Sequence, residues 1–167
     1  MKDKSSMRKD ILSLLERNAK LTAEEIAVFL DVPEATVSKE IKNMEKERII
    51  CGYGAFINWS LTDNASLTAL IEVKVTPARG KGFKRIAERI YRFDEVKAVY
   101  LMSGDYDLAV IIEGKSLESI ALFVSDKLSP LESVLSTATH FVLRKFKDYG
   151  VIFNEQGDDT ERMIVSP

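Results

Sequence analysis

The sequence predicts an α+β protein, with a winged-helix-like helix-turn-helix domain at the N-terminus and a ferredoxin-like βαββαβ domain after it. Two observations support this fold class. Apolar residues recur at helical spacing through residues 11–44, whereas strand-like alternation and helical spacing take turns beyond residue 66. Turn-forming residues from Asn58 to Asn64 separate the two patterns. The predicted boundaries are 1–57 for the first domain, 58–65 for a linker, 66–153 for the second domain and 154–167 for a flexible tail.

Helical signals dominate the first domain. Thr22 and Glu25 have the spacing of a capping box, in which each side chain bonds a backbone donor at the start of a helix. Asp31 follows that helix where the chain must turn, and Asp is one of the few residues besides Gly that tolerates positive φ. A preceding helix is predicted after Asp10. The apolar residues of these two helices are Ile11, Leu12, Leu14 and Leu15, then Ile26, Ala27 and Leu30.

The third predicted helix carries two chemically different faces. At about 100° per residue, Val37, Ile41 and Met44 fall on one side, and a polar, basic set falls on the other. Such a face on the second helix of a helix-turn-helix pair suits the major groove of DNA. A solvated lysine face on a protein that never binds DNA is the alternative that periodicity leaves open. The candidate DNA-binding residues are Ala35, Thr36, Ser38, Lys39, Lys42, Asn43 and Lys46.

The charge of the first domain is balanced rather than basic. Residues 1–60 hold ten Lys or Arg and ten Asp or Glu, so the remainder accounts for the whole net charge of −2. A nucleic-acid-binding domain commonly has a basic surplus. Here the basic residues are local, on the third helix and near the N-terminus at Lys2, Lys4, Arg8 and Lys9. One copy would therefore bind DNA with modest affinity, which favours a dimer that presents two such helices.

Composition is that of ordinary globular material, with 46% hydrophobic and 30% charged residues in a chain of 167. The single cysteine, Cys51, excludes an internal disulfide and fits a reducing compartment. No secretion signal is recognisable, and the longest apolar runs, such as Leu108–Ile112, are strand-sized. We therefore expect a cytoplasmic protein. The only histidine, His140, has no catalytic motif partner, and neither a phosphate-binding loop nor a zinc spacing is present. We expect no enzyme activity, cofactor or metal.

The second domain is predicted as strand, helix, two strands, helix and strand. One face of the resulting sheet lies under the two helices. The other, carrying Leu70, Val73 or the residues alternating with them, is too apolar to stay in water, so a second copy should cover it. The predicted strands are 66–76, 96–102, 107–113 and 134–146, and Pro77 and Gly80 end the first of them. The first helix is marked by Phe83, Ile86, Ala87, Ile90 and Phe93. The second helix is marked by Ile120, Val124 and Leu128, and Pro130 ends it.

The loop Ser103–Asp107 is a second place where binding chemistry is concentrated. Gly104 permits close backbone approach, and Asp105 and Asp107 are acceptors for the ammonium group of a ligand. A strand period of two puts Thr137 and Thr139 on one face, so both hydroxyls can reach one ligand. A hairpin turn whose Asp side chains bond their own backbone is the alternative. Two carboxylates alone do not predict a metal, since a hard cation needs six or more oxygens.

Four motifs, together with the order of elements, resemble the Lrp/AsnC family of transcriptional regulators, also called feast/famine regulatory proteins. The resemblance covers roughly residues 5–153. It implies dimers formed through the C-terminal sheets, often assembled into tetramers or octamers, and a small effector, commonly an amino acid, held where dimers meet. The motifs are Ala35-Thr36-Val37, Ile50-Cys51-Gly52-Tyr53, Ser103-Gly104-Asp105-Tyr106-Asp107 and Thr137-Ala138-Thr139. The candidate effector-binding residues are Met102, Gly104, Asp105, Tyr106, Asp107, Thr137 and Thr139.

Four positions depart from the family pattern. Pro33 stands where the family usually has the capping Ser, and Glu34 where it has Pro. Glu34 suits the helix dipole but would repel a nearby phosphate. Asp31 and Arg48 occupy positions where the family usually has Gly. DNA contacts therefore cannot be copied from a relative, and tight sequence specificity does not follow from the resemblance.

Three functions are consistent with these residues. The favoured one is a ligand-responsive transcriptional regulator that binds double-stranded DNA through the first domain and an effector through the oligomeric second domain. An amino-acid-binding regulatory module of an enzyme, or a small enzyme, is the principal rival, although no catalytic constellation supports it. An architectural DNA-binding protein without an effector is the third.

Overall fold

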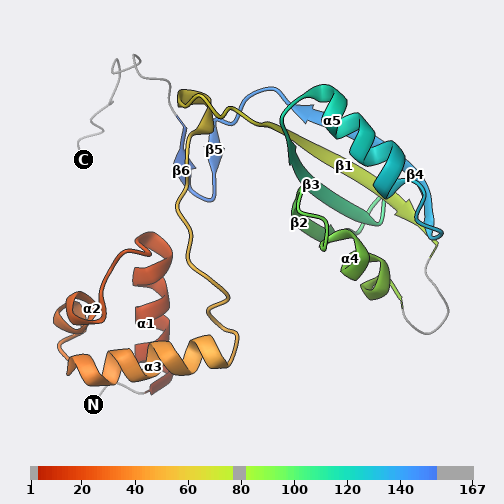
Figure 1. Cartoon of the computed structure of the whole chain (residues 1–167). Helices are drawn as coiled ribbons and strands as arrows, with labels where there is room; N and C mark the ends of the chain where they lie inside the picture. The colour runs from red at the N-terminus through yellow and green to blue at the C-terminus, as the bar shows by residue number, and fades with distance from the viewer. Residues whose placement is uncertain (1–3, 77–81, 154–167) are drawn as a thin grey trace, which may run out of the picture. The chain divides into compact units, whose positions relative to one another are not determined.

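The computed structural model describes residues 4–76 and 82–153, and the chain divides into two compact units between Ile57 and Asn58. Figure 1 shows a helical first unit and a second unit built around a sheet. The predictions for Pro77, Gly80 and the tail 154–167 lie outside the described residues. None of the described helices has the length and apolarity needed to cross a membrane.

The first unit is three helices around a small apolar core, as predicted. α1 begins at Lys4, well before Asp10, because Met7 packs against the core and Arg8 bonds to the third helix. Residues 4–57 contain no strand. The helices are α1 (Lys4–Arg17), α2 (Ala23–Leu30) and α3 (Glu34–Lys46). The buried core consists of Ile11, Leu15, Ile26, Ala27, Val37 and Met44.

The predicted helix start and turn of the first unit are confirmed. The Glu25 amide donates to Thr22 Oγ1 at 3.2 Å, and the Thr22 amide donates to Glu25 Oε2 at 2.8 Å. Asp31 ends α2 with φ of 54°, and Arg48 follows α3 with φ of 60°. Both positions are therefore left-handed, the conformation for which Gly is the usual residue. Pro33 precedes α3 without a side-chain cap.

Residues 51–57 belong to no strand among the described residues. The Tyr53 hydroxyl donates to Glu45 Oε1 at 2.9 Å, which ties this segment back to α3. The second unit then opens with a short 3₁₀ turn, η1 (Trp59–Leu61), where Asn58 Oδ1 accepts from the Ser60 amide at 3.3 Å.

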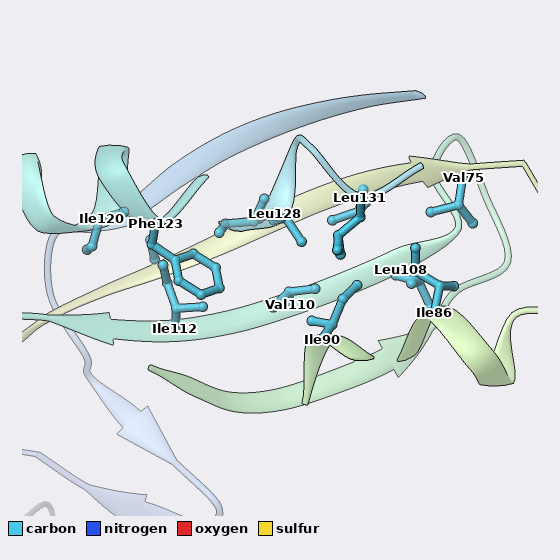
Figure 2. Packing of buried hydrophobic residues seen from close by; sticks show 13 residues of the cluster. Val75, Ile86, Ile90, Leu108, Val110, Ile112, Ile120, Phe123, Leu128 and Leu131 are labelled. Carbon is cyan, nitrogen blue, oxygen red and sulfur yellow. The ribbon is translucent and has the colours of Figure 1, made fainter. Parts of the chain in front are cut away.

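The second unit is a four-stranded antiparallel sheet with the strand order β2-β3-β1-β4, which confirms the predicted βαββαβ topology. Figure 2 shows Ile86 of α4 beside Leu108 of β3, and Ile90 of α4 beside Val110 of β3. The side chains of the second helical stretch, such as Phe123, join the same cluster, so both helices cover one face. The elements are β1 (Leu67–Val75), α4 (Lys84–Ile90), β2 (Val96–Leu101), β3 (Leu108–Gly114), α5 (Leu117–Leu122) and β4 (Val134–Val142).

Alternation along β1 separates the covered face from the uncovered one. Ile71 and Val73 are fully buried beneath the helices, whereas Leu70 and Glu72 point to the other face and are partly exposed. Naming Val73 with Leu70 for the uncovered face was therefore wrong for Val73, because residues three apart on a strand point to opposite faces. Leu70 remains on the uncovered face.

The second helical stretch ends at Leu128, close to Pro130 as predicted, but it changes from α to π geometry in η2 (Phe123–Leu128). The predicted end of the last strand was wrong. β4 ends at Val142, not at residue 146, because Val142 pairs with Thr68 at the start of β1 and no partner strand continues beyond it among the described residues. Instead, β5 (Lys147–Asp148) pairs with β6 (Val151–Ile152) in a hairpin that the sequence analysis missed. Its two turn residues, Tyr149 and Gly150, both have positive φ, so a Gly after a short strand was the available signal.

Candidate DNA interface and effector loop

One side of α3 anchors the helix to its own unit. Val37 and Met44 have no exposed surface, and Ile41 packs at the edge of the same cluster. These are the three residues that the helical spacing placed on the apolar face. The opposite side of α3 is therefore free to face a partner.

The opposite side of α3 carries the predicted basic stripe. Lys39, Lys42 and Lys46 are exposed and form no ion pair or hydrogen bond within the part of the chain that the structure describes. Ala35 is exposed as well, so it leaves room beside them. Unpaired ammonium groups on one helix face can meet phosphates without first breaking an internal ion pair. The other three candidate DNA-binding residues, Thr36, Ser38 and Asn43, are partly buried.

A charged clamp between α1 and α3 was missed by the sequence analysis. Arg8 Nε donates to Glu40 Oε2 at 2.7 Å, and the two terminal nitrogens of Arg8 donate to the carboxylate of Glu47 at 2.8 and 2.9 Å. Lys4 Nζ lies 3.6 Å from Glu40 Oε1, and the side-chain amide of Asn43 donates to the same oxygen at 3.5 Å. Arg8 and Lys4 therefore hold α3 instead of adding free basic charge near the N-terminus.

The electrostatics of this clamp favour ionised carboxylates. Hydrogen bonds from Arg8 lower the pKa of Glu40 and that of Glu47 below the ordinary value of 4.5, more than burial raises them. The same bonds raise the pKa of Arg8. Glu40 is only 6% exposed. Its position between Val37 and Met44, three residues from one and four from the other, was the sequence signal that it faces inward.

The first turn of α3 is acidic. Glu34 is its first residue, and Pro33 before it provides no hydroxyl to cap the helix. A carboxylate there is favoured by the helix dipole but repels a phosphate that approaches this end. The basic stripe starts one turn later, at Lys39. The start of α3 is therefore acidic, whereas its exposed lysines begin only at Lys39.

The loop Ser103–Asp107 connects β2 to β3, and its last residue is tied to β1. The Asp107 amide donates to the Val73 carbonyl at 3.1 Å, and the Val75 amide donates to Asp107 Oδ2 at 2.8 Å. The register of β1 against β4 shifts between Lys74 and Val75. Asp107 thus supplies an acceptor at an irregular point of the sheet. Its carboxylate bonds a neighbouring strand, not its own turn, and one of its two oxygens is engaged.

The rest of the loop is open. Asp105 and Gly104 are exposed, and Tyr106 is partly buried. A Cβ added to Gly104 would meet nothing within 4 Å. No close approach among the described residues therefore explains the glycine, and the space beside it is available to a ligand or another subunit. Asp105 makes no side-chain interaction with any described residue.

The two threonines lie elsewhere on the sheet. Thr137 pairs with Val73 and Thr139 with Ile71, so both threonines point to the helix-covered face. They share one face of the strand, as the sequence spacing predicted. β1 lies between them and the loop, which puts Thr137 and the loop about two strand spacings, or ~10 Å, apart. The chain alone does not gather the loop and the threonines around one cavity.

A hollow of about 920 Å³ does form on the second unit, but at the opposite end of the sheet. Its lining includes Lys97, Ile111, Glu113 and Val142, and none of the seven candidate effector residues. Size alone therefore does not identify it as the effector site.

Each of the two units matches a known protein family. Residues 5–50 match the winged helix-turn-helix DNA-binding family, and residues 68–152 match the Lrp/AsnC ligand binding domain. The second match alone spans half of the chain, and its range coincides closely with the βαββαβ unit.

Relatives extend the match over nearly the whole chain. The HTH-type transcriptional regulator YugG of Bacillus subtilis, described as uncharacterized, is 52% identical over 159 residues that cover 95% of each chain. The HTH-type transcriptional regulator Ptr1 of Methanocaldococcus jannaschii is 30% identical over 138 residues, covering 83% of this chain and 90% of the relative.

Solved structures share the fold. AsnC of E. coli superimposes with a TM-score of 0.64 at 20% identity, covering 84% of this chain and 92% of that one. The regulator NMB0573 of Neisseria meningitidis, solved in complex with L-Met, gives 0.69 at 22% identity, covering 89% and 94%. With the matched families and the relatives of similar length, these likenesses lead to one assignment: the chain belongs to the Lrp/AsnC family of HTH-type transcriptional regulators.

Proposed function

We propose that two copies of this regulator place α3 in successive major grooves of DNA, and that the second unit binds a free amino acid which alters that binding. The observation that carries the DNA part is the exposed, unpaired stripe of Lys39, Lys42 and Lys46 opposite the buried face of α3. The protein works in the cytoplasm and has no catalytic activity of its own.

The uncovered face of the sheet supports the dimer. Leu70, Ala98 and Ile111 contribute apolar surface to it and are only partly buried. A second copy covers such a face most simply, through a contact related by twofold symmetry. The dimer then supplies the second recognition helix that a charge-balanced first unit needs. Half-sites should lie about one helical turn of DNA, or a multiple, apart. Tetramers or octamers would form from these dimers.

The chemistry of the loop supports an amino-acid effector. Asp105 and the second oxygen of Asp107 can accept bonds from an ammonium group, while backbone amides near Gly104 can donate to a carboxylate. Met102 and Tyr106 would line the side-chain end, with Thr137 and Thr139 supplied by an adjoining subunit. The structural neighbour NMB0573 was solved with L-Met, so L-methionine is the first ligand to test.

The DNA interface is tested with the double variant Lys39→Ala/Lys42→Ala. DNA for the assay is a duplex that the wild-type chain selects from a random pool. Removing one lysine–phosphate interaction should reduce the slope of log K against log salt by roughly 0.9, so binding should weaken and its salt dependence should flatten. The matched control is Lys97→Ala/Lys115→Ala, which removes two exposed lysines from the second unit. Equal affinities for the two double variants would refute the assigned interface.

The effector loop is tested by calorimetric titration of L-methionine and the other free amino acids. Asp105→Asn and Asp107→Asn remove charge but keep a side-chain oxygen, so Asp107→Asn preserves an acceptor for the Val75 amide. Losing a charge-assisted bond to the ammonium group should cost on the order of 1.5–3 kcal/mol of binding. Unchanged affinity in both variants would place the effector elsewhere. Absence of binding by every amino acid would favour the architectural alternative.

A further inference from the structure

A hollow of about 570 Å³ lies on the first unit where α2 turns into α3. Its apolar lining residues are Ala27, Val28, Val32 and Pro33, and its other three lining residues, named here the acidic rim, carry carboxylates. Val28 is 77% exposed, so its apolar side chain stays in contact with water unless a partner covers it. The lysine stripe of α3 takes no part in this hollow.

Three carboxylates form the acidic rim: Glu24 of α2, Asp31 at its end and Glu34 at the start of α3. Within the described residues none of their side chains has a cation or a hydrogen-bond donor as partner. Glu24 and Val28 are four residues apart and therefore neighbours on one helix face. Negative charge and exposed apolar surface thus meet in one concave place.

This combination decides which partner fits. DNA and an anionic lipid surface would be repelled by the three carboxylates, and a second copy would bring the same negative charges face to face. A Lys or Arg side chain fits, because its apolar stem can lie on Val28 and Pro33 while its charged end reaches the rim. A neighbouring apolar residue on the partner would complete the contact.

We propose that this hollow docks a basic, amphipathic segment of another protein. The contact combines burial of Val28 with opposite charge across the rim, so it should weaken as salt rises. Docking would also neutralise Glu34 at the start of α3. The inference stands on the hollow itself and does not require the proposed DNA contacts.

The test uses the full chain and a labelled helical peptide with Leu on one face and Arg on the other, measured by fluorescence anisotropy without DNA. A matched peptide carries Glu in place of every Arg. The wild-type chain should bind the Arg peptide and not the Glu peptide. Val28→Ser should weaken binding about tenfold or more, as expected for a contact at the centre of a small interface.

The control variant is Phe29→Ser. Phe29 is 66% exposed on the same helix but does not line the hollow, so its loss should leave peptide affinity unchanged. Glu24→Gln/Glu34→Gln should weaken binding and flatten its salt dependence. Equal affinities for Val28→Ser and Phe29→Ser would overturn the proposal, as would binding of the Glu peptide. Displacement of the Arg peptide by millimolar spermidine at constant ionic strength would also overturn it, because the hollow would then be a site for small cations.

Discussion

The two units hold their key elements by different means. In the first, α3 is fixed by a core of six buried apolar residues and by the Arg8–Glu40–Glu47 clamp. In the second, thirteen buried apolar residues lie between one sheet face and its two helices. α3 therefore has the smaller apolar support, so charge contributes more to its position than it does in the sheet. The sheet depends on apolar packing, with polar side chains at its irregular points.

The largest expected effects come from truncating the two cores. Met44→Ala in the first unit and Ile71→Ala in the second should each cost about 2–5 kcal/mol of the free energy of unfolding, because both side chains are fully buried. If the units unfold separately, calorimetry should show each substitution lowering one transition. Leu135→Ala is the control, since Leu135 is exposed and surface changes usually stay within about 0.5 kcal/mol. A single transition lowered equally by both core substitutions would contradict independent units.

A polar anchor in the second unit should have the next largest effect. Asp107→Ala leaves the Val75 amide without its acceptor at a shifted register, which should cost about 1–3 kcal/mol. Asp107→Asn keeps an oxygen in place and should cost less. Thermal unfolding of the two variants, measured without ligand, separates this structural role from effector binding. Equal destabilisation by Asn and Ala would show that the negative charge, not the acceptor, is what β1 requires.

Patterns within a single element were the part of the fold that the sequence predicted well. The two faces of α3 and the βαββαβ order follow from spacing of 3.6 and of 2, which local sequence records directly. The partner of Glu40 does not follow from spacing, because Arg8 lies 32 residues away and meets Glu40 only after α1 packs on α3. The sequence therefore indicated that Glu40 faces inward, but it did not indicate that Arg8 is its partner.

The candidate site divides in the same way. The exposure of Lys39, Lys42 and Lys46 follows from their helix face, so sequence was sufficient to predict it. Asp107 was predicted as a ligand acceptor or a turn former, and its bond to Val75 depends on a register shift that no local pattern announces. The location of Thr137 across β1 from the loop likewise depends on strand order, which only the folded sheet defines.

The clamp in the first unit predicts a dependence of stability on pH. Glu40 and Glu47 have pKa values below 4.5 in the folded chain, so they contribute stability above their unfolded pKa and lose it as pH falls through the folded value. The first unit should therefore lose stability on acidification below about pH 4.5. Glu95, whose pKa is lowered by Lys127, gives the second unit a smaller dependence of the same sign, because it is one carboxylate in a partly exposed pair.

Substitution of Arg8 tests that assignment. Arg8→Leu leaves Glu40 inward-facing without its main partner, so it should destabilise the first unit at pH 7 and reduce the acid-dependent loss. Arg8→Leu/Glu40→Leu should recover part of the stability, because the unpaired carboxylate is gone. Melting curves between pH 7 and pH 3.5 would measure both effects. An acid response unchanged in Arg8→Leu would show that other groups cause it.

The smallest expected effect concerns the turn after α3, where Arg48 has φ of 60°. The Ile49 amide donates to the Met44 carbonyl at 2.9 Å, so a left-handed residue is needed to close the helix end. A side chain with a Cβ is strained in this conformation, and Gly is not. Arg48→Gly should therefore stabilise the first unit by about 0.5–1 kcal/mol, the strain relieved being partly offset by the greater freedom of Gly in the unfolded chain. Arg48→Ala is the control, since it removes the charge and keeps the Cβ. Denaturant unfolding of both variants should show a gain for Gly alone, and an equal gain for Ala would assign the effect to the arginine side chain instead of the backbone.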